Sequence, residues 1–163
     1  MPSRWPRKER ALSSNEVLEP LFLDTNILIR YLTQDDPDKA AGARALLKQV
    51  EAGQVTLVTS ESIVVEAVQV LSSKILYKQP RAKVASDITI ILSLPKLKLP
   101  NKRVCLRALM LWANASASVD FVDALSVAQM EHLGISTIAS FDRDFDRFPH
   151  IKRQPPQAAG DFN

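Results

Sequence analysis

The chain alternates short apolar runs with longer helix-like stretches, and this alternation restricts the possible fold more than any other feature. Residues 21–23, 55–58 and 135–139 are short runs rich in aliphatic side chains, as buried strands are. Helix-like stretches separate them. Strands that alternate with helices predict an α/β fold with a mainly parallel central sheet flanked by helices.

Proline and glycine mark the expected helix boundaries. Pro37 opens a helix that ends near Gly53, Pro80 opens one that continues to about residue 94, and Gly134 ends one that starts at Asp120. Further helices are expected over residues 27–32, 60–76 and 102–113. Residues 95–100, bracketed by prolines, are expected to connect two helices.

A single domain accounts for most of the 163 residues. We expect it to span residues 20–153. Residues 1–19 show neither a helical nor a strand period and are expected to form a flexible arm. Residues 154–163, which contain paired prolines, are expected to form a disordered tail.

Cysteine and histidine are too scarce for a disulfide or a zinc site. The lone Cys105 cannot pair within the chain, which favours a reducing compartment. His132 and His150 with one cysteine cannot supply the usual ligands of zinc, so a bound metal needs oxygen ligands. No apolar run approaches the roughly 18 residues of a membrane span. We therefore expect a cytoplasmic protein without membrane contact.

Positive charge is concentrated in one part of the sequence. Residues 74–107 contain nine Lys or Arg residues and one acid, Asp87, so this segment carries +8 and the remainder −5 of the net +3. Such a distribution is typical of a protein that holds a polyanion near bound cations, although solvated helix faces are an alternative. The RNA-binding candidates, whose charges should point away from the core, are Lys78, Arg81, Lys83, Lys98, Lys102 and Arg103.

Glu66 is the most informative acidic residue. It lies in a stretch that is apolar on nearly every side, which predicts a buried carboxylate. A buried carboxylate must be paired, neutralised or bound to a metal, and no Lys or Arg lies within helical reach. A remote salt bridge is an alternative. A metal site is the favoured interpretation.

Other acids occupy strand ends and helix starts. Asp24 follows the apolar run at residues 21–23, beside Asn26, where a turn or helix cap is the alternative role. Asp120 and Asp123 stand three residues apart and share a helix face. We prefer Asp123 as a metal ligand because its neighbours are apolar, whereas Asp120 is placed to cap the helix.

The last acidic group follows the third expected strand. Asp142 is closest to that strand and is the preferred ligand, whereas Asp144 and Asp146 also fit a solvated turn. Ser140 precedes Asp142 and could orient a ligand or substrate. A calcium loop of the EF-hand type is excluded because Arg147 and Arg153 occupy positions that need glycine and glutamate.

Four of these carboxylates, Asp24, Glu66, Asp123 and Asp142, should converge. In parallel sheets, ligands bind beyond the carboxyl ends of the strands, where these residues are expected. Crowded carboxylates cannot all ionise without a cation among them. Hard oxygen ligands select Mg²⁺ or Mn²⁺, which promote phosphodiester displacement. The pattern predicts a catalytic metal site.

Three motifs and Glu66 together resemble the PIN domain family, and more narrowly the VapC toxins of bacterial toxin–antitoxin pairs. The motifs are LDTNIL at residues 23–28, DFVDAL at 120–125 and SFDRDF at 140–145. The resemblance implies a three-layer α/β fold and a metal-dependent endoribonuclease that forms a homodimer and is inhibited by an antitoxin protein. It assigns the acidic quartet to the same four residues. Ser140 stands where the family commonly has Thr, which keeps the hydroxyl.

Three alternative functions compete with this one. They are a PIN-like RNA-processing nuclease without an antitoxin, a catalytically inactive RNA-binding module, and a phosphatase of the haloacid dehalogenase type. The presence of all four carboxylates disfavours the inactive module. The phosphatase is disfavoured because it needs an Asp at the position of Asn26.

Overall fold

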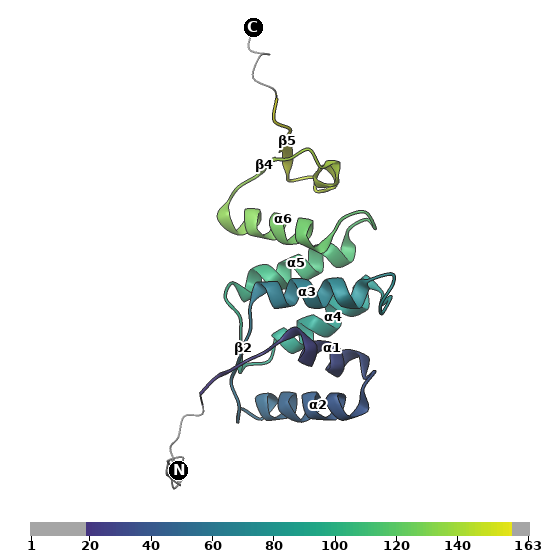
Figure 1. Ribbon diagram of the computed structural model, residues 1–163. Helices are drawn as coiled ribbons and strands as arrows, with labels where there is room; N and C mark the ends of the chain where they lie inside the picture. Colours follow the sequence, from purple (N-terminus) through teal and green to yellow (C-terminus); the bar gives the residue numbers. More distant parts are fainter. Residues whose placement is uncertain (1–18, 158–163) are drawn as a thin grey trace, which may run out of the picture.

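The structure, a computed structural model, describes residues 19–157 and stacks its helices in successive layers (Figure 1). The arm expected at residues 1–19 falls almost entirely outside this range. None of the helices in the described range is long and apolar enough to cross a bilayer. The helices are α1 (Thr25–Thr33), α2 (Pro37–Glu51), α3 (Glu61–Ser72), α4 (Arg81–Leu92), α5 (Lys102–Asn114), α6 (Phe121–Leu133) and the 3₁₀ helix η1 (Arg143–Arg147).

The described strands are short and pair in parallel, as expected for the predicted α/β class. Strands β1 (Leu21–Phe22), β2 (Leu57–Val58) and β3 (Leu97–Lys98) form one sheet in that order. Strands β4 (Thr137–Ala139) and β5 (Lys152–Gln154) form a second one. The mainly parallel arrangement with flanking helices is confirmed, but the strands are divided between two sheets.

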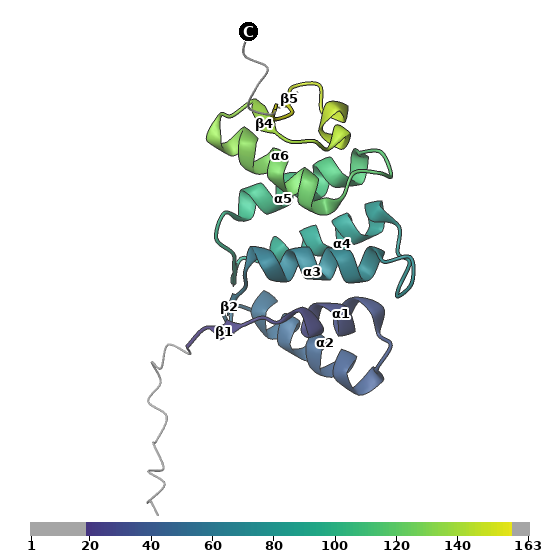
Figure 2. The same ribbon diagram turned by 45° about the horizontal axis from the view of Figure 1, so that its top comes forward.

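The two sheets lie in different parts of the molecule. Both views draw β1 and β2 beside the layer of α1 and α2, whereas β4 and β5 lie beyond α6 (Figure 2). The carboxyl ends of β1 and β4 therefore do not meet at one sheet edge. Asp24 and Asp142, which follow these strands in the chain, therefore come after strands of different sheets.

Two apolar clusters hold the layers together. The larger one contains the buried face of α3, with Val64, Ala67, Val68 and Leu71 at helical spacing, packed against side chains of the neighbouring layers. The smaller cluster fixes the C-terminal segment against α6. Its buried members are Val119, Val127, Met130, Phe145, Phe148 and Ile151.

The expected helix boundaries at proline and glycine are confirmed. Pro37 is the first residue of α2, Pro80 immediately precedes α4, and Gly134 caps α6 in the left-handed conformation, with φ 70°. The helix expected over residues 60–76 ends earlier, at Ser72, where the chain turns.

Two strands were missed by the sequence analysis. β3 lies in the segment expected to be a connection, and β5 includes Gln154, which we had placed at the start of the disordered tail. Its residues, Lys152 to Gln154, are polar and largely exposed, so β5 carries no apolar signal.

Candidate metal centre

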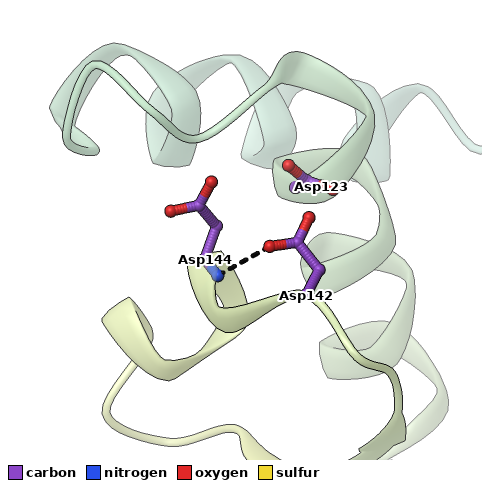
Figure 3. Close-up of side chains that lie close together, drawn as sticks. All are labelled: Asp123, Asp142 and Asp144. Carbon is purple, nitrogen blue, oxygen red and sulfur yellow. Dashed lines mark hydrogen bonds between the residues drawn. The ribbon is translucent and has the colours of Figure 1, made fainter.

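Three aspartates form an acidic cluster at the start of α6. Asp123, Asp142 and Asp144 each offer one carboxylate oxygen, and these three atoms all lie within 4.8 Å of one another (Figure 3). Asp142 was a predicted ligand, Asp123 was preferred over Asp120, and Asp144 was an additional candidate. We call these residues the acidic cluster.

Local structure explains why these three side chains meet. Asp123 lies in the first turn of α6, and Asp142 caps η1, whose second residue is Asp144. Phe145, next to Asp144, is buried in the small apolar cluster with Val127 of α6. Apolar packing therefore holds η1 against α6 and brings like charges together, which costs free energy in the absence of a cation.

Each carboxylate has one oxygen held by a donor from the protein. Asp123 Oδ2 accepts from the Asp120 backbone N–H at 3.1 Å, and Asp142 Oδ1 accepts from the Asp144 backbone N–H at 2.9 Å. Asp144 Oδ1 accepts from Ser118 Oγ at 2.7 Å and from Arg147 Nε at 3.0 Å. One oxygen of each aspartate is thus oriented by hydrogen bonds, as ligating carboxylates in metal sites usually are, and the hydrogen bonds among residues 19–157 leave the other oxygen available to a ligand.

The pKa of Asp123 is raised and that of Asp144 is lowered, as expected if no cation lies close to Asp123. Burial raises the pKa of Asp123, the Asp120 backbone N–H partly offsets this, and the charges of Asp142, Asp120 and Asp144 raise it further. The pKa of Asp144 is lowered, because Ser118 and then Arg147 donate hydrogen bonds to its carboxylate. A divalent cation with hard oxygen ligands fits this donor set.

The polar residues next to the acidic cluster make hydrogen bonds that shape the protein rather than offer oxygens to a metal. Asp120 is the N-cap residue of α6, as expected, and its backbone N–H orients Asp123. Ser140 Oγ accepts from the Asp142 backbone N–H at 3.0 Å, so it shapes the turn that carries Asp142. Asp146 lies outside the acidic cluster, because Arg153 binds both of its oxygens at 2.9 and 3.1 Å.

The other two predicted ligands form a separate group. Thr25 Oγ1 donates to Glu66 Oε2 at 2.7 Å, and Asp24 caps α1 directly before Thr25. Asp24 Oδ2 accepts from Asn26 Nδ2 at 3.2 Å. Among the described residues, Asp24 and Glu66 are not members of the acidic cluster. Of the four predicted carboxylates, the structure therefore brings Asp123 and Asp142 together, whereas Asp24 and Glu66 lie outside the acidic cluster.

Glu66 is exposed, which contradicts the prediction of a buried carboxylate. The buried positions of α3 are Val64, Ala67, Val68 and Leu71, and Glu66 lies between them on the opposite side of the helix. It borders a cavity of about 490 Å³ between α3 and α6, whose far wall includes Val122, next to Asp123. Glu66 therefore lies on the same cavity as the first turn of α6, the turn that contains Asp123.

All six basic candidates were expected to point into solvent. For two of them, Lys102 and Arg81, this prediction is wrong. Lys102 is partly buried, donates to the Leu97 carbonyl, and has its pKa lowered by burial. Arg81 donates to the carbonyls of Ser116 at 3.1 Å and Ala117 at 2.7 Å. The exposed candidates are Lys78, Lys83, Lys98 and Arg103, of which Lys83 pairs with Asp87.

The α5–α6 loop connects Arg81 to the acidic cluster. The Arg81 guanidinium lies 5.0 Å from the centroid of the Trp112 ring and binds two carbonyls of this loop. One residue further, Ser118 donates to Asp144. Ser118 was not predicted to have a role, because a serine in a turn of small residues gives no sequence signal for this contact.

Ser118→Ala is expected to weaken Mn²⁺ binding roughly tenfold, because it removes a donor that orients Asp144. Loss of this hydrogen bond raises the pKa of Asp144, so the pH at which half of the binding is lost should also rise. Calorimetric titration with Mn²⁺ at several pH values measures both effects. Ser126→Ala is the control, since Ser126 Oγ donates to Val122 within α6. Equal affinities in the two variants would contradict the assignment.

Comparisons with known proteins assign this α/β chain to a family. The family model described as the PIN domain matches residues 21–151. The chain therefore belongs to the PIN domain family, and the resemblance stated from the motifs is confirmed.

The remaining comparisons are more distant. No curated protein sequence matches significantly. Among solved structures, the chain is similar to the crystal structure of Mycobacterium tuberculosis VapC20, a sarcin–ricin loop cleaving toxin. The two are 20% identical over 77% of this chain and 92% of that one, with a TM-score of 0.33.

Proposed function

We propose that this protein is a divalent-metal-dependent endoribonuclease. The acidic cluster carries the proposal, because three carboxylates within 4.8 Å and one raised pKa indicate a site built for a cation. Membership of the PIN domain family and the basic segment at residues 74–107 support RNA as the substrate.

Asp123, Asp142 and Asp144 would hold the ion, with Mg²⁺ or Mn²⁺ as the expected species. When bound, such an ion stabilises charge on a phosphodiester and acidifies a water nucleophile. The protein's own part is orientation. The Asp120 and Asp144 backbone N–H groups, Ser118 and Arg147 fix one oxygen of each carboxylate.

Asp24 and Glu66 form the second carboxylate pair of the proposed site. Thr25 holds Glu66 by a hydrogen bond, and Asn26 holds Asp24. Glu66 lies on the cavity wall opposite Val122, so an RNA strand that reaches Asp123 passes close to it. We assign this pair to substrate positioning or to a further cation.

The test is cleavage of a defined single-stranded RNA by the purified full chain. Excess EDTA is expected to stop cleavage, and Mg²⁺ or Mn²⁺ to restore it, whereas Zn²⁺ alone should not, because the described ligands are all oxygens. RNA ends mapped by sequencing identify the cleavage site. Full activity in excess chelator, or no cleavage with either metal, would exclude the proposed function.

The toxin role is the finer part of the proposal and rests on the VapC-like motifs. A toxin of this type pairs with an antitoxin and forms a homodimer. Co-expression with the product of a small upstream gene should suppress cleavage and yield a stable complex. A chain that cleaves RNA but has no such partner would instead be an RNA-processing nuclease.

A further inference from the structure

A cavity lies between the C-terminal end of α3, the start of α4 and the α5–α6 loop, and its wall includes Asp120, whose backbone N–H binds Asp123 of the acidic cluster. Its volume is about 710 Å³. This is within the range of roughly 300–1,000 Å³ that is typical of sites for small ligands. Both views draw the α3–α4 loop, the α5–α6 loop and η1 on the same side of the stack (Figures 1 and 2).

The cavity wall combines cations with amide groups. Lys74, Lys78 and Arg81 contribute positive charge, and Asp120 is the single acid among its lining residues. Gln69 and Gln79 contribute amides. Cations bind phosphates, and amides pair with the edges of unpaired bases, so the wall has the composition of a nucleotide site.

The backbone at the rim of this cavity is held in an unusual conformation. Lys78 has a φ of 53°, in the left-handed region that lysine seldom adopts. Hydrogen bonds from Lys78 N to the Ser73 carbonyl and from Gln79 N to the Leu71 carbonyl fold the loop back onto α3. This geometry places both side chains on the cavity wall. Gln79 Oε1 is buried and accepts no hydrogen bond from the described residues, so its acceptor capacity is unused within that range.

Arg81 provides a rigid surface rather than a mobile charge. Trp112 lies against its guanidinium, and the Ser116 and Ala117 carbonyls bind two of its N–H groups. Unpaired bases stack on arginine planes that are held in this way. The same loop leads through Ser118 to Asp144, and Asp120 is shared between the cavity wall and the start of α6.

We propose that this cavity binds one nucleotide of single-stranded RNA next to the phosphate that is cleaved. Lys74 and Lys78 bind its backbone phosphate, the base stacks on Arg81, and Gln79 contributes to the choice of base. This inference rests on the proposed ribonuclease function and adds the place where the substrate is recognised.

The experiment measures RNA binding separately from cleavage. The full chain with Asp123→Asn, which should not cleave, is titrated into fluorescently labelled hexanucleotides of A, C, G or U, and anisotropy is recorded at several salt concentrations. Lys74→Glu with Lys78→Glu is compared with Lys39→Glu and Lys48→Glu. The latter pair changes the net charge equally but lies on exposed positions of α2, in a different layer.

The cavity pair is expected to weaken binding at least tenfold more than the α2 pair. It should also reduce the log–log salt slope by about 0.7, which corresponds to one phosphate contact on a single strand. Gln79→Leu should change the ratios of affinity among the four hexanucleotides at least threefold. In protein with Asp123 intact, the cavity pair should raise KM with kcat almost unchanged.

Equal effects of the cavity pair and the α2 pair would overturn the inference, and unchanged base ratios in Gln79→Leu would overturn the assignment of that residue. Equally strong competition by polyglutamate would identify an acidic peptide as the occupant instead. If the reversed pair fails to fold by circular dichroism, Lys74→Gln with Lys78→Gln repeats the comparison. If the protein cleaves RNA but the cavity pair does not weaken RNA binding, only the role of the cavity is rejected. If the cavity pair weakens RNA binding but the protein with Asp123 intact does not cleave RNA, only the ribonuclease function is rejected.

Discussion

Asp123→Asn is expected to lower kcat/KM for RNA cleavage roughly 100-fold or more, because it removes a metal ligand. The same change should raise the Tm of the metal-free protein. Burial and the charges of Asp142, Asp120 and Asp144 raise the pKa of Asp123, so its ionised form is disfavoured in the fold. Asparagine removes that charge and still accepts the hydrogen bond from the Asp120 backbone N–H.

The pH dependence has a definite sign. A folded-state pKa above the unfolded one means that the folded protein binds more protons between the two values, so stability falls as pH rises through this window. At neutral pH the penalty is fully present without metal. The difference in Tm between Asp123→Asn and wild type should therefore be largest at neutral pH and should disappear in acid.

Thermal unfolding with and without Mn²⁺ measures these effects. Mn²⁺ should raise the Tm of the wild type, because a ligand that binds only the folded state stabilises it, but should not raise that of Asp123→Asn. Asp38→Asn is the matched control. Asp38 is also an acid in the first turn of a helix, where its charge is favourable, so its loss should leave Tm unchanged or slightly lower. A lower Tm in metal-free Asp123→Asn would show that the cluster is not strained.

Charge and local pattern in the sequence selected two of the three residues of the acidic cluster, Asp123 and Asp142, as preferred ligands. Asp123 was selected because its neighbours are apolar, and in the structure Ala124 and Leu125 beside it are buried. Asp142 was selected because it follows an expected strand, and it lies between β4 and η1. Asp142 was preferred to Asp144, but the turn of η1, which no local pattern predicts, brings both residues to the cluster. Ser118 was not predicted because a single serine in a turn shows no sequence pattern that indicates its hydrogen bond to Asp144.

Long-range arrangement was harder to predict than local structure. Helix limits at Pro37, Pro80 and Gly134 follow from backbone chemistry at single residues. The division into two sheets depends on pairing between strands of two or three residues, too short to show a period. Glu66 was misjudged for a related reason. Composition described its helix as apolar all round, whereas the i, i+3, i+4 and i+7 positions alone are buried.

Glu66→Gln is expected to reduce kcat/KM for RNA cleavage more than tenfold without loss of stability. Glutamine still accepts the hydrogen bond from Thr25 Oγ1, so the packing of α1 against α3 is preserved. Glu61→Gln is the matched control, because Glu61 lies on the same helix, borders the same cavity and also accepts one hydrogen bond, from Gln129. Activity of Glu66→Gln above about a tenth of wild type would remove Glu66 from the reaction.

Mn²⁺ titration of Glu66→Gln then shows how the two acidic groups cooperate. An unchanged Mn²⁺ affinity with reduced kcat means that Glu66 acts across the cavity on the RNA or on a further cation, as the separation of the groups implies. A reduced affinity means that Glu66 ligates the same ion as Asp123, which requires α3 and the start of α6 to approach during the reaction. Thr25→Val should reproduce part of the loss and Thr25→Ser should restore it, because Thr25 acts only by holding Glu66 through its hydroxyl.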